Sequence, residues 1–157
     1  MPDYDFSSEW RIEAPVQNVW DQIANPPLWP QWWPGCIQAV EVAPHRETGP
    51  GRRYRFQWRG RLPYRLPMEI ELTEREPPRL LAGTVEGSLA GSAIWRLSGD
   101  EAQTRVGFQL AVDVQKPWMK RWVPLTQALF RWNFRTLMEE GRKGLGNQLD
   151  AATAPIE

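Results

Sequence analysis

The stretch that decides the fold runs from residue 117 to residue 149 and reads PWMKRWVPLTQALFRWNFRTLMEEGRKGLGNQL. Upstream of it apolar and polar residues alternate, whereas here the apolar residues recur every three or four positions, which predicts a long helix. At ~100° per residue, they fall into two stripes roughly 140° apart. The first stripe holds Trp118, Trp122, Leu125, Leu129 and Trp132, and the second holds Phe130, Phe134, Leu137, Met138 and Leu145.

Two apolar stripes imply two contacts, because one stripe is enough to dock a helix on a sheet. We expect the second stripe to face a sheet through Phe130, Phe134, Leu137 and Met138. The first stripe must then meet a lid, another subunit or a membrane. Pro124 either starts the regular helix after a prelude of one turn or kinks it.

The rest of the chain predicts strands. Period-two alternation separated by turn residues predicts an antiparallel meander of about seven strands. We expect short helices at 16–25, after Pro15, and around 28–33. The fold class is therefore α+β, with a curved antiparallel sheet around a long C-terminal helix and two short helices after the first strand. The predicted strands are 4–13, 37–42, 53–59, 68–73, 81–85, 94–97 and 106–114.

Charge narrows the class of partner. The formal net charge is zero, whereas proteins that bind nucleic acid usually carry a basic excess. Arg53 and Arg55 alternate outward on one strand, but Glu69 and Glu71 alternate outward on the next. We expect these side chains to pair across the strands on the solvent face. The sequence therefore predicts no nucleic-acid partner.

Composition also bounds the cofactors and the compartment. The chain has one cysteine, Cys36, and one histidine, His45, which excludes an internal disulfide, a Cys-based zinc site and a His-pair motif. No apolar run approaches the roughly 18 residues of a membrane span, and the N-terminus has no signal segment. We expect one domain over residues 1–150, a flexible tail over 151–157, a cytoplasmic location, and neither metal nor cofactor.

Short motifs carry a family resemblance: IEAPVQNVWD at 12–21, LWPQWWP at 28–34, and WRL at 95–97 followed by TRV at 104–106. With the order of predicted elements, they resemble the START-like (SRPBCC) superfamily of polyketide cyclase/dehydrase and lipid-transport proteins. The resemblance implies a helix-grip fold that holds a hydrophobic molecule, such as a lipid, a quinone or an aromatic polyketide, between sheet and helix. It also allows cyclase or aromatase activity, which some members have.

In such a fold the inner face of the sheet and the second helix stripe would line the site. Tyr54 and Asn133 could each offer a hydrogen bond in otherwise apolar surroundings. Trp29, Trp32 and Trp33 should close one end, and the ten tryptophans could equally fill the cavity. The predicted ligand-binding residues are Trp10, Trp33, Tyr54, Phe56, Trp58, Trp95, Phe108, Phe130, Asn133, Phe134 and Leu137.

The sequence assigns no catalytic residue. His45 lies in a polar loop, Glu69 and Glu71 alternate away from the apolar face, and Cys36 has no flanking base to activate it. A cyclase of this type could act by folding a reactive chain while a few groups polarise its carbonyls. The candidates for that role are Tyr54, Tyr64 and Arg59 or Arg61.

Three functions stay open at this point. The leading hypothesis is the binding of a hydrophobic small molecule, and the second is an enzyme of cyclase, aromatase or dehydrase type. The third is a membrane-surface or protein-interaction adapter, or a homodimer, built on the first helix stripe. It rests on the segment 116–122, KPWMKRW, because tryptophans interleaved with cations are typical of interfacial membrane contacts.

Overall fold

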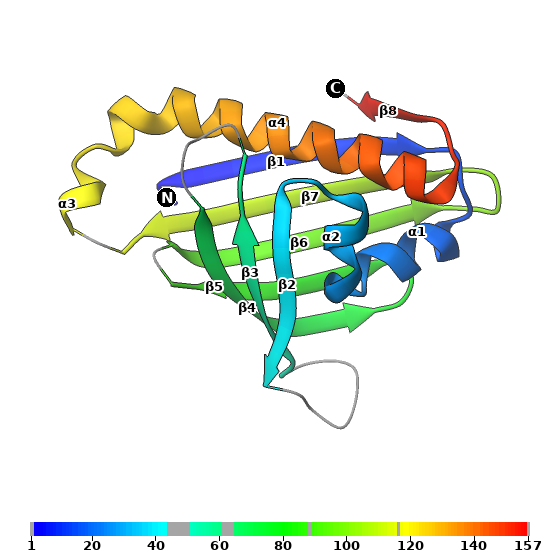
Figure 1. Cartoon of the computed structure of the whole chain (residues 1–157), viewed down its shortest axis with the longest axis horizontal. Helices are drawn as coiled ribbons and strands as arrows, with labels where there is room; N and C mark the ends of the chain where they lie inside the picture. Colours follow the sequence, from blue (N-terminus) through cyan, green and yellow to red (C-terminus); the bar gives the residue numbers. More distant parts are fainter. Residues whose placement is uncertain (1, 44–50, 61–64, 88, 116, 157) are drawn as a thin grey trace.

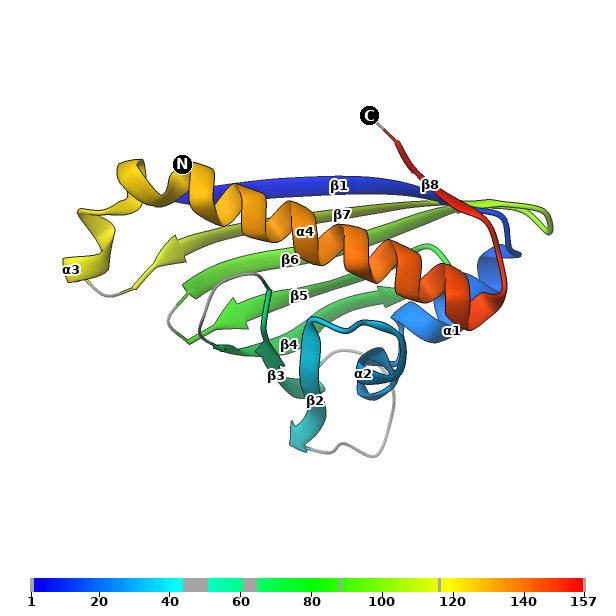
Figure 2. The ribbon, with the colours of Figure 1, turned by 45° about the horizontal axis from the view of Figure 1, so that its top comes forward.

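A curved sheet of eight strands forms one layer of the protein, and a long helix lies across its concave face (Figures 1 and 2). The structure is a computed structural model that describes residues 2–43, 51–60, 65–87, 89–115 and 117–156. The strand order is β2-β3-β4-β5-β6-β7-β1-β8, and every neighbouring pair is antiparallel. The predicted α+β helix-grip architecture is confirmed.

The element bounds follow the predicted order, with one strand added at the end of the chain. The strands are β1 (Tyr4–Ile12), β2 (Cys36–Ala43), β3 (Arg53–Trp58), β4 (Leu66–Glu76), β5 (Leu80–Glu86), β6 (Leu89–Gly99), β7 (Thr104–Val114) and β8 (Thr153–Ile156). The helical segments are α1 (Val16–Ile23), the 3₁₀ turn η1 (Pro26–Leu28), α2 (Trp29–Trp32), α3 (Pro117–Lys120) and α4 (Val123–Leu149).

The inner face of the sheet is apolar because the alternation of each strand matches that of its neighbour. Along β1, Tyr4, Phe6 and Trp10 are buried while the residues between Tyr4 and Phe6 and on either side of Trp10 are exposed. Antiparallel pairing sets Phe6 opposite Leu110 and Trp10 opposite Val106 on β7. Directly opposed residues project on the same side of a sheet, so the two strands share one apolar surface.

The outer face carries the predicted charge pairs. The Arg53 Nε and Glu71 Oε1 atoms lie 3.6 Å apart, and the Arg55 Nη2 and Glu69 Oε2 atoms lie 3.4 Å apart. Both pairs sit directly across β3 and β4. Exposed pairs of this kind contribute little to stability, but they occupy the arginines that could otherwise form a basic patch.

Pro124 lies at the start of helix α4, after a separate helical turn, and does not kink the helix. The single turn of α3 precedes it, and Pro124 lies in its first turn, where a missing N–H costs no helical hydrogen bond. The second predicted stripe faces the sheet, with Phe134, Met138 and Leu145 buried. Among the described residues, no helix has both the length and the apolar character that a bilayer crossing requires.

Glycines let the short helix α2 approach the C-terminal half of α4. A Cβ atom at Gly144 would lie 1.6 Å from the carbonyl oxygen of Trp32, and one at Gly141 would lie 2.6 Å from the Trp33 ring. Neither distance is compatible with a side chain. The two glycines therefore allow α2 and Trp33, the residue that follows it, to pack directly against α4.

The segment that we expected to be a flexible tail forms an eighth strand instead. Asp150 ends α4 in a left-handed conformation with a φ of 51°, and the chain then turns back so that β8 pairs with the end of β1. The Thr153 hydroxyl accepts a hydrogen bond from Arg142 Nη1 at 2.9 Å. The small, polar composition of this segment hid the strand, because composition does not reveal that β1 would otherwise have an open edge.

Candidate functional site

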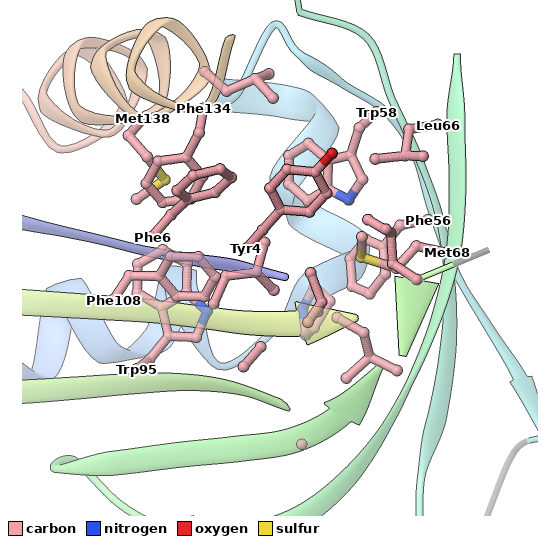
Figure 3. Close-up of a pocket in the computed structure, with 18 of the residues that line it drawn as sticks. Tyr4, Phe6, Phe56, Trp58, Leu66, Met68, Trp95, Phe108, Phe134 and Met138 are labelled. Carbon is pink, nitrogen blue, oxygen red and sulfur yellow. The ribbon is translucent and has the colours of Figure 1, made fainter. Parts of the chain in front are cut away.

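A cavity of about 200 Å³ lies between the concave face of the sheet and α4 (Figure 3). Its walls come from β1, the helical segments η1 and α2, strands β3 to β7, and α4. None of the described residues that line it carries a charge. Among the described lining side chains, the nitrogen- and oxygen-bearing groups are the hydroxyls of Tyr4 and Tyr54, the indole N–H groups and the Asn133 amide.

The predicted ligand-binding residues gather around this cavity with one exception. Trp33, Tyr54, Phe56, Trp58, Trp95, Phe108, Phe130, Asn133, Phe134 and Leu137 all line it. Trp10 does not, although its side chain is fully buried. The rings of Trp33 and Trp95 lie over it, with centroids 6.3 and 5.9 Å away. Trp10 therefore belongs to the core next to these two rings and does not line this cavity.

Trp29 and Trp33 close one end of the cavity, whereas Trp32, which we expected beside them, does not line it. Trp29 of α2 lies 5.8 Å from Trp95 and 6.0 Å from Trp58, measured between ring centroids. Trp33 lies edge-on to Trp58 at 4.9 Å. The Trp29 indole N–H donates to the Ile23 carbonyl at 3.1 Å, which fixes its ring plane. These tryptophans narrow the cavity without filling it.

Phenylalanines from helix and sheet form the opposite wall. Phe134 of α4 lies 5.1 Å from Phe6 and 6.1 Å from Phe108, with the second pair stacked. Phe108 in turn lies 4.4 Å from Trp95. Figure 3 shows Phe134 and Met138 pointing from α4 toward Phe6 and Phe108 on the sheet. The wall is therefore a continuous aromatic surface that spans both layers.

The polar groups around the cavity are few, and each has a distinct setting. The Tyr4 hydroxyl lies 2.9 Å from Thr126 Oγ1 on α4. Asn133 lies directly over Gly60, where an added Cβ atom would lie 2.1 Å from the Asn133 Oδ1 atom. Burial raises the pKa of Tyr54 above its usual value, and the nearby Arg52 guanidinium opposes that shift in part. Tyr54 therefore stays a neutral phenol that can donate a hydrogen bond.

The other candidate groups that the structure describes do not line the cavity. Arg59 is exposed, and Glu69 and Glu71 lie on the outer face in their ion pairs. Cys36 is buried outside the lining, and burial raises the pKa of its thiol to about 12. His45, Arg61 and Tyr64 lie outside the described residues. Within the described ranges, no cluster of metal-ligating side chains is present.

Several wall residues were not predicted from the sequence. Tyr4 and Phe6 line the cavity. They share their strand face with Trp10, so the alternation along β1 already predicted that their side chains point inward. The alternation does not tell which end of the strand faces the cavity. Met68, Ile70 and Leu72 of β4 also line it, and their alternation with glutamates carried the same information. The further wall residues include Pro26, Leu66, Leu81, Gly83, Leu89, Ala93, Leu110, Val112 and Val114.

Solved structures share this architecture at low sequence identity. A protein of Thermus thermophilus superposes with a TM-score of 0.74 at 17% identity, covering 92% of this chain and 99% of that one. The Zhui aromatase/cyclase of a Streptomyces species gives a TM-score of 0.76 at 11% identity, covering 94% and 93%. A START superfamily protein of Mycobacterium smegmatis gives 0.74 at 11% identity, covering 93% and 97%. These likenesses establish the fold alone.

The sequence itself settles the family. A search of curated proteins gives no match. A family model described as polyketide cyclase/dehydrase and lipid transport, however, matches residues 4–149. That range holds β1, the short helices, the meander and α4, which together enclose the cavity. The chain therefore belongs to the polyketide cyclase/dehydrase and lipid transport family.

Proposed function

We propose that this protein binds a small, uncharged aromatic molecule in the cavity between the sheet and α4. The observation that carries the proposal is the composition of the walls, in which aromatic and aliphatic side chains surround about 200 Å³ and no described lining residue is charged. Ligand sites are typically apolar with a few placed polar groups. Burying a charged ligand here would leave its charge unpaired, at a large cost.

The volume sets the size of the ligand. An engineered apolar cavity of about 150 Å³ holds one benzene molecule, whereas sites for drug-sized ligands span roughly 300–1,000 Å³. A cavity of about 200 Å³ therefore suits one or two fused rings. A long acyl chain or an extended polyketide would require the wall tryptophans to move.

The walls favour an aromatic ligand over an aliphatic one of the same size. Aromatic rings gain from edge-to-face and offset-stacked contacts beyond the area that they bury. Trp33 and Trp58 already meet edge-on at 4.9 Å, while Phe108 and Phe134 stack at 6.1 Å. A flat ring between these pairs would meet both ring faces and ring edges. Tyr54 could donate a hydrogen bond to one oxygen of the ligand.

The test is a size series of probes: benzene, naphthalene and pyrene, titrated against the purified protein. Tryptophan fluorescence reports binding, because Trp29, Trp33, Trp58 and Trp95 line the cavity. We expect benzene and naphthalene to bind and pyrene to fail. Equal binding of all three probes, or of none to the folded protein, would contradict the proposal.

A matched pair of variants assigns the binding to this cavity. Ala93 is buried on the inner face of β6 and lines the cavity, whereas Ala111 on the adjacent β7 does not line it. Ala93→Phe should abolish naphthalene binding, and Ala111→Phe should leave it unchanged. Should Ala93→Phe not fold, Ala93→Leu makes the same test. Undiminished binding by a folded Ala93 variant would place the probe elsewhere.

A second candidate function is a cyclase or aromatase reaction, and the Tyr54 phenol is the observation that favours it. Because burial raises its pKa and keeps it protonated, this phenol could donate a hydrogen bond to a substrate carbonyl and so polarise it toward ring closure. Tyr54→Phe would then lower turnover of an aromatic-forming substrate while leaving naphthalene binding intact. Unchanged turnover in Tyr54→Phe would remove the basis of this candidate.

A further inference from the structure

One face of α4 remains apolar and exposed in the folded protein. The exposed fractions are 51% for Trp122, 74% for Leu125, 45% for Leu129 and 49% for Trp132. These are the described members of the first predicted stripe, and the Trp118 side chain lies outside the described part of the structure. We call these four residues the outer stripe. No described helix or strand lies over this part of α4 in either view (Figures 1 and 2).

The outer stripe is not a misplaced part of the core. It lies on α4 away from Phe134 and Met138, which are buried against the sheet. Residues 122, 125, 129 and 132 follow the spacing of three and four that aligns side chains along one helix face. Large apolar side chains grouped in this way on a surface mark an interaction site.

The charged residues within the segment that carries the outer stripe are all positive. Residues 117–135 contain Lys120, Arg121, Arg131 and Arg135 and no aspartate or glutamate. All four cations are exposed. Lys120 makes one long ion pair with Asp3, at 3.8 Å, whereas the three arginines make no ion pair with another described residue. The stripe is thus flanked by three arginines that no acidic residue in the described part of the chain pairs with.

A second copy of the chain fits this face poorly. Taking about 200 Å² as the area of an aromatic side chain and as an upper value for a leucine, four roughly half-exposed residues offer at most about 400 Å². A stable protein interface buries roughly 800 Å² per partner. Self-association through the stripe would also bring the same arginines of two copies together, and like charges at an interface repel.

We propose that the outer stripe docks the protein on an anionic lipid bilayer. Helices that lie in the membrane interface pair an apolar face rich in Trp and Leu with flanking Lys and Arg. Tryptophan rings settle at the level of the headgroups, and basic side chains are drawn to anionic lipid. The outer stripe and its arginines supply each of these parts along α4 and the turn that precedes it.

Docking would place one wall of the cavity beside the bilayer. Phe130 and Asn133, which line the cavity, directly follow Leu129 and Trp132 of the outer stripe in the sequence. An apolar ligand dissolved in the membrane would then be near the helix wall of the site. This consequence rests on the proposed function, whereas the docking itself does not.

The test is sedimentation of the full chain with vesicles of phosphatidylcholine, with and without phosphatidylserine. We expect binding to the mixed vesicles, much weaker binding to phosphatidylcholine alone, and release by high salt. Trp122→Ser/Trp132→Ser should lower binding at least about tenfold, because it removes the inserting rings. Lipids with brominated chains should quench the fluorescence of the wild type more than that of this variant.

Two charge variants distinguish docking through the outer stripe from a general attraction of the protein to anionic lipid. Arg131→Gln/Arg135→Gln should weaken binding to the mixed vesicles and flatten its salt dependence. Arg11→Gln/Arg96→Gln removes the same charge from exposed positions on the sheet and should bind nearly as well as the wild type. Equal losses in both charge variants, or vesicle binding unaffected by the tryptophan variant, would overturn the proposal.

A last measurement keeps the two proposals distinct. Trp122 and Trp132 do not line the cavity, so the tryptophan variant should bind naphthalene normally without vesicles. Sedimentation velocity of the wild type should show a monomer. A dimer that the tryptophan variant dissociates, together with no vesicle binding, would assign the stripe to self-association and reject membrane docking.

Discussion

The indole N–H of Trp33 donates a hydrogen bond of 2.8 Å to the backbone carbonyl of Leu137. This bond joins the residue that ends α2 to the middle of α4. It forms where Gly141, one helical turn further on, leaves room for the Trp33 ring. Both partners line the cavity, so the bond links the tryptophan end of the site to its helix wall.

Replacing Trp33 with phenylalanine keeps an aromatic ring and removes the donor. We expect the free energy of unfolding to fall by about 1–2 kcal/mol, from the lost hydrogen bond and looser packing. Urea denaturation followed by circular dichroism measures the change. Trp132→Phe makes the same substitution on an exposed residue of α4 and should stay within about 0.5 kcal/mol of the wild type. Equal effects at the two positions would mean that the bond contributes nothing.

The close approach of α2 to α4 makes Gly144 sensitive to a single methyl group. Alanine is favoured over glycine in a helix by about 1 kcal/mol, so an unconstrained site would gain stability from Gly144→Ala. Here the new Cβ atom would lie 1.6 Å from the Trp32 carbonyl oxygen. Because backbone must shift, we expect a net loss of about 1–3 kcal/mol in the free energy of unfolding.

The matched control for that substitution is Gly107→Ala, whose new Cβ atom would meet its nearest neighbours at 3.9 and 4.0 Å. It should be neutral or slightly stabilising in the same denaturation experiment. A Gly144→Ala protein as stable as the wild type would show that α2 can withdraw from α4 at no cost.

The sequence predicts the two faces of α4 because a helix of this length samples each face several times. Phe134 and Met138 point inward and Leu125 and Trp132 point outward, as the helical period required. Which residues of β1 reach the cavity was not predictable in the same way. Alternation fixes the face of Trp10 but not whether it lines the cavity or packs in the core against Trp33 and Trp95, which depends on contacts distant in the chain.

Two further features, strand β8 and the contact between α2 and α4, could not be predicted from the local sequence pattern. Strand β8 exists because β1 offers a free edge to the returning chain, and a segment of four residues with one proline carries no strand signal of its own. The closeness of α2 to α4 depends on Gly141 and Gly144, which from the sequence alone would be expected only to destabilise the helix. Their role is seen only in the structure, where Trp33 packs against Gly141 and the Trp32 carbonyl packs against Gly144.

The Cys36 thiol should be inert in the folded protein. Burial raises its pKa from an ordinary value of 9.0 to about 12, so the nucleophilic thiolate is scarce at mildly alkaline pH. Iodoacetamide should label Cys36 rapidly in denaturant and very slowly without it, as mass spectrometry can measure. Fast labelling of the native protein would show that the site opens often or that the thiol is more acidic than its burial implies.

The same shift gives the stability a pH dependence of known sign. The folded state holds the thiol proton more tightly than the unfolded state, so this contribution is complete below pH 9.0 and is lost as the pH rises toward about 12. Cys36→Ala has no thiol to titrate. The difference in unfolding free energy between wild type and Cys36→Ala should therefore shift against the wild type over that range.

Truncating Phe130 should change which ligands fit. Its ring lies edge-on to Tyr4 at 5.3 Å and lines the helix wall of the cavity, and it is only half-buried. Phe130→Ala should therefore cost less than the roughly 3–5 kcal/mol typical of a fully buried phenylalanine. It should also extend the cavity along α4, so that anthracene binds the variant more tightly than it binds the wild type.

Leu125→Ala, on the outward face of the same helix, should leave the preference for naphthalene unchanged. If Phe130→Ala stays folded and discriminates between naphthalene and anthracene as the wild type does, then the ring of Phe130 does not limit the length of the site, and the tryptophans at the other end must set it.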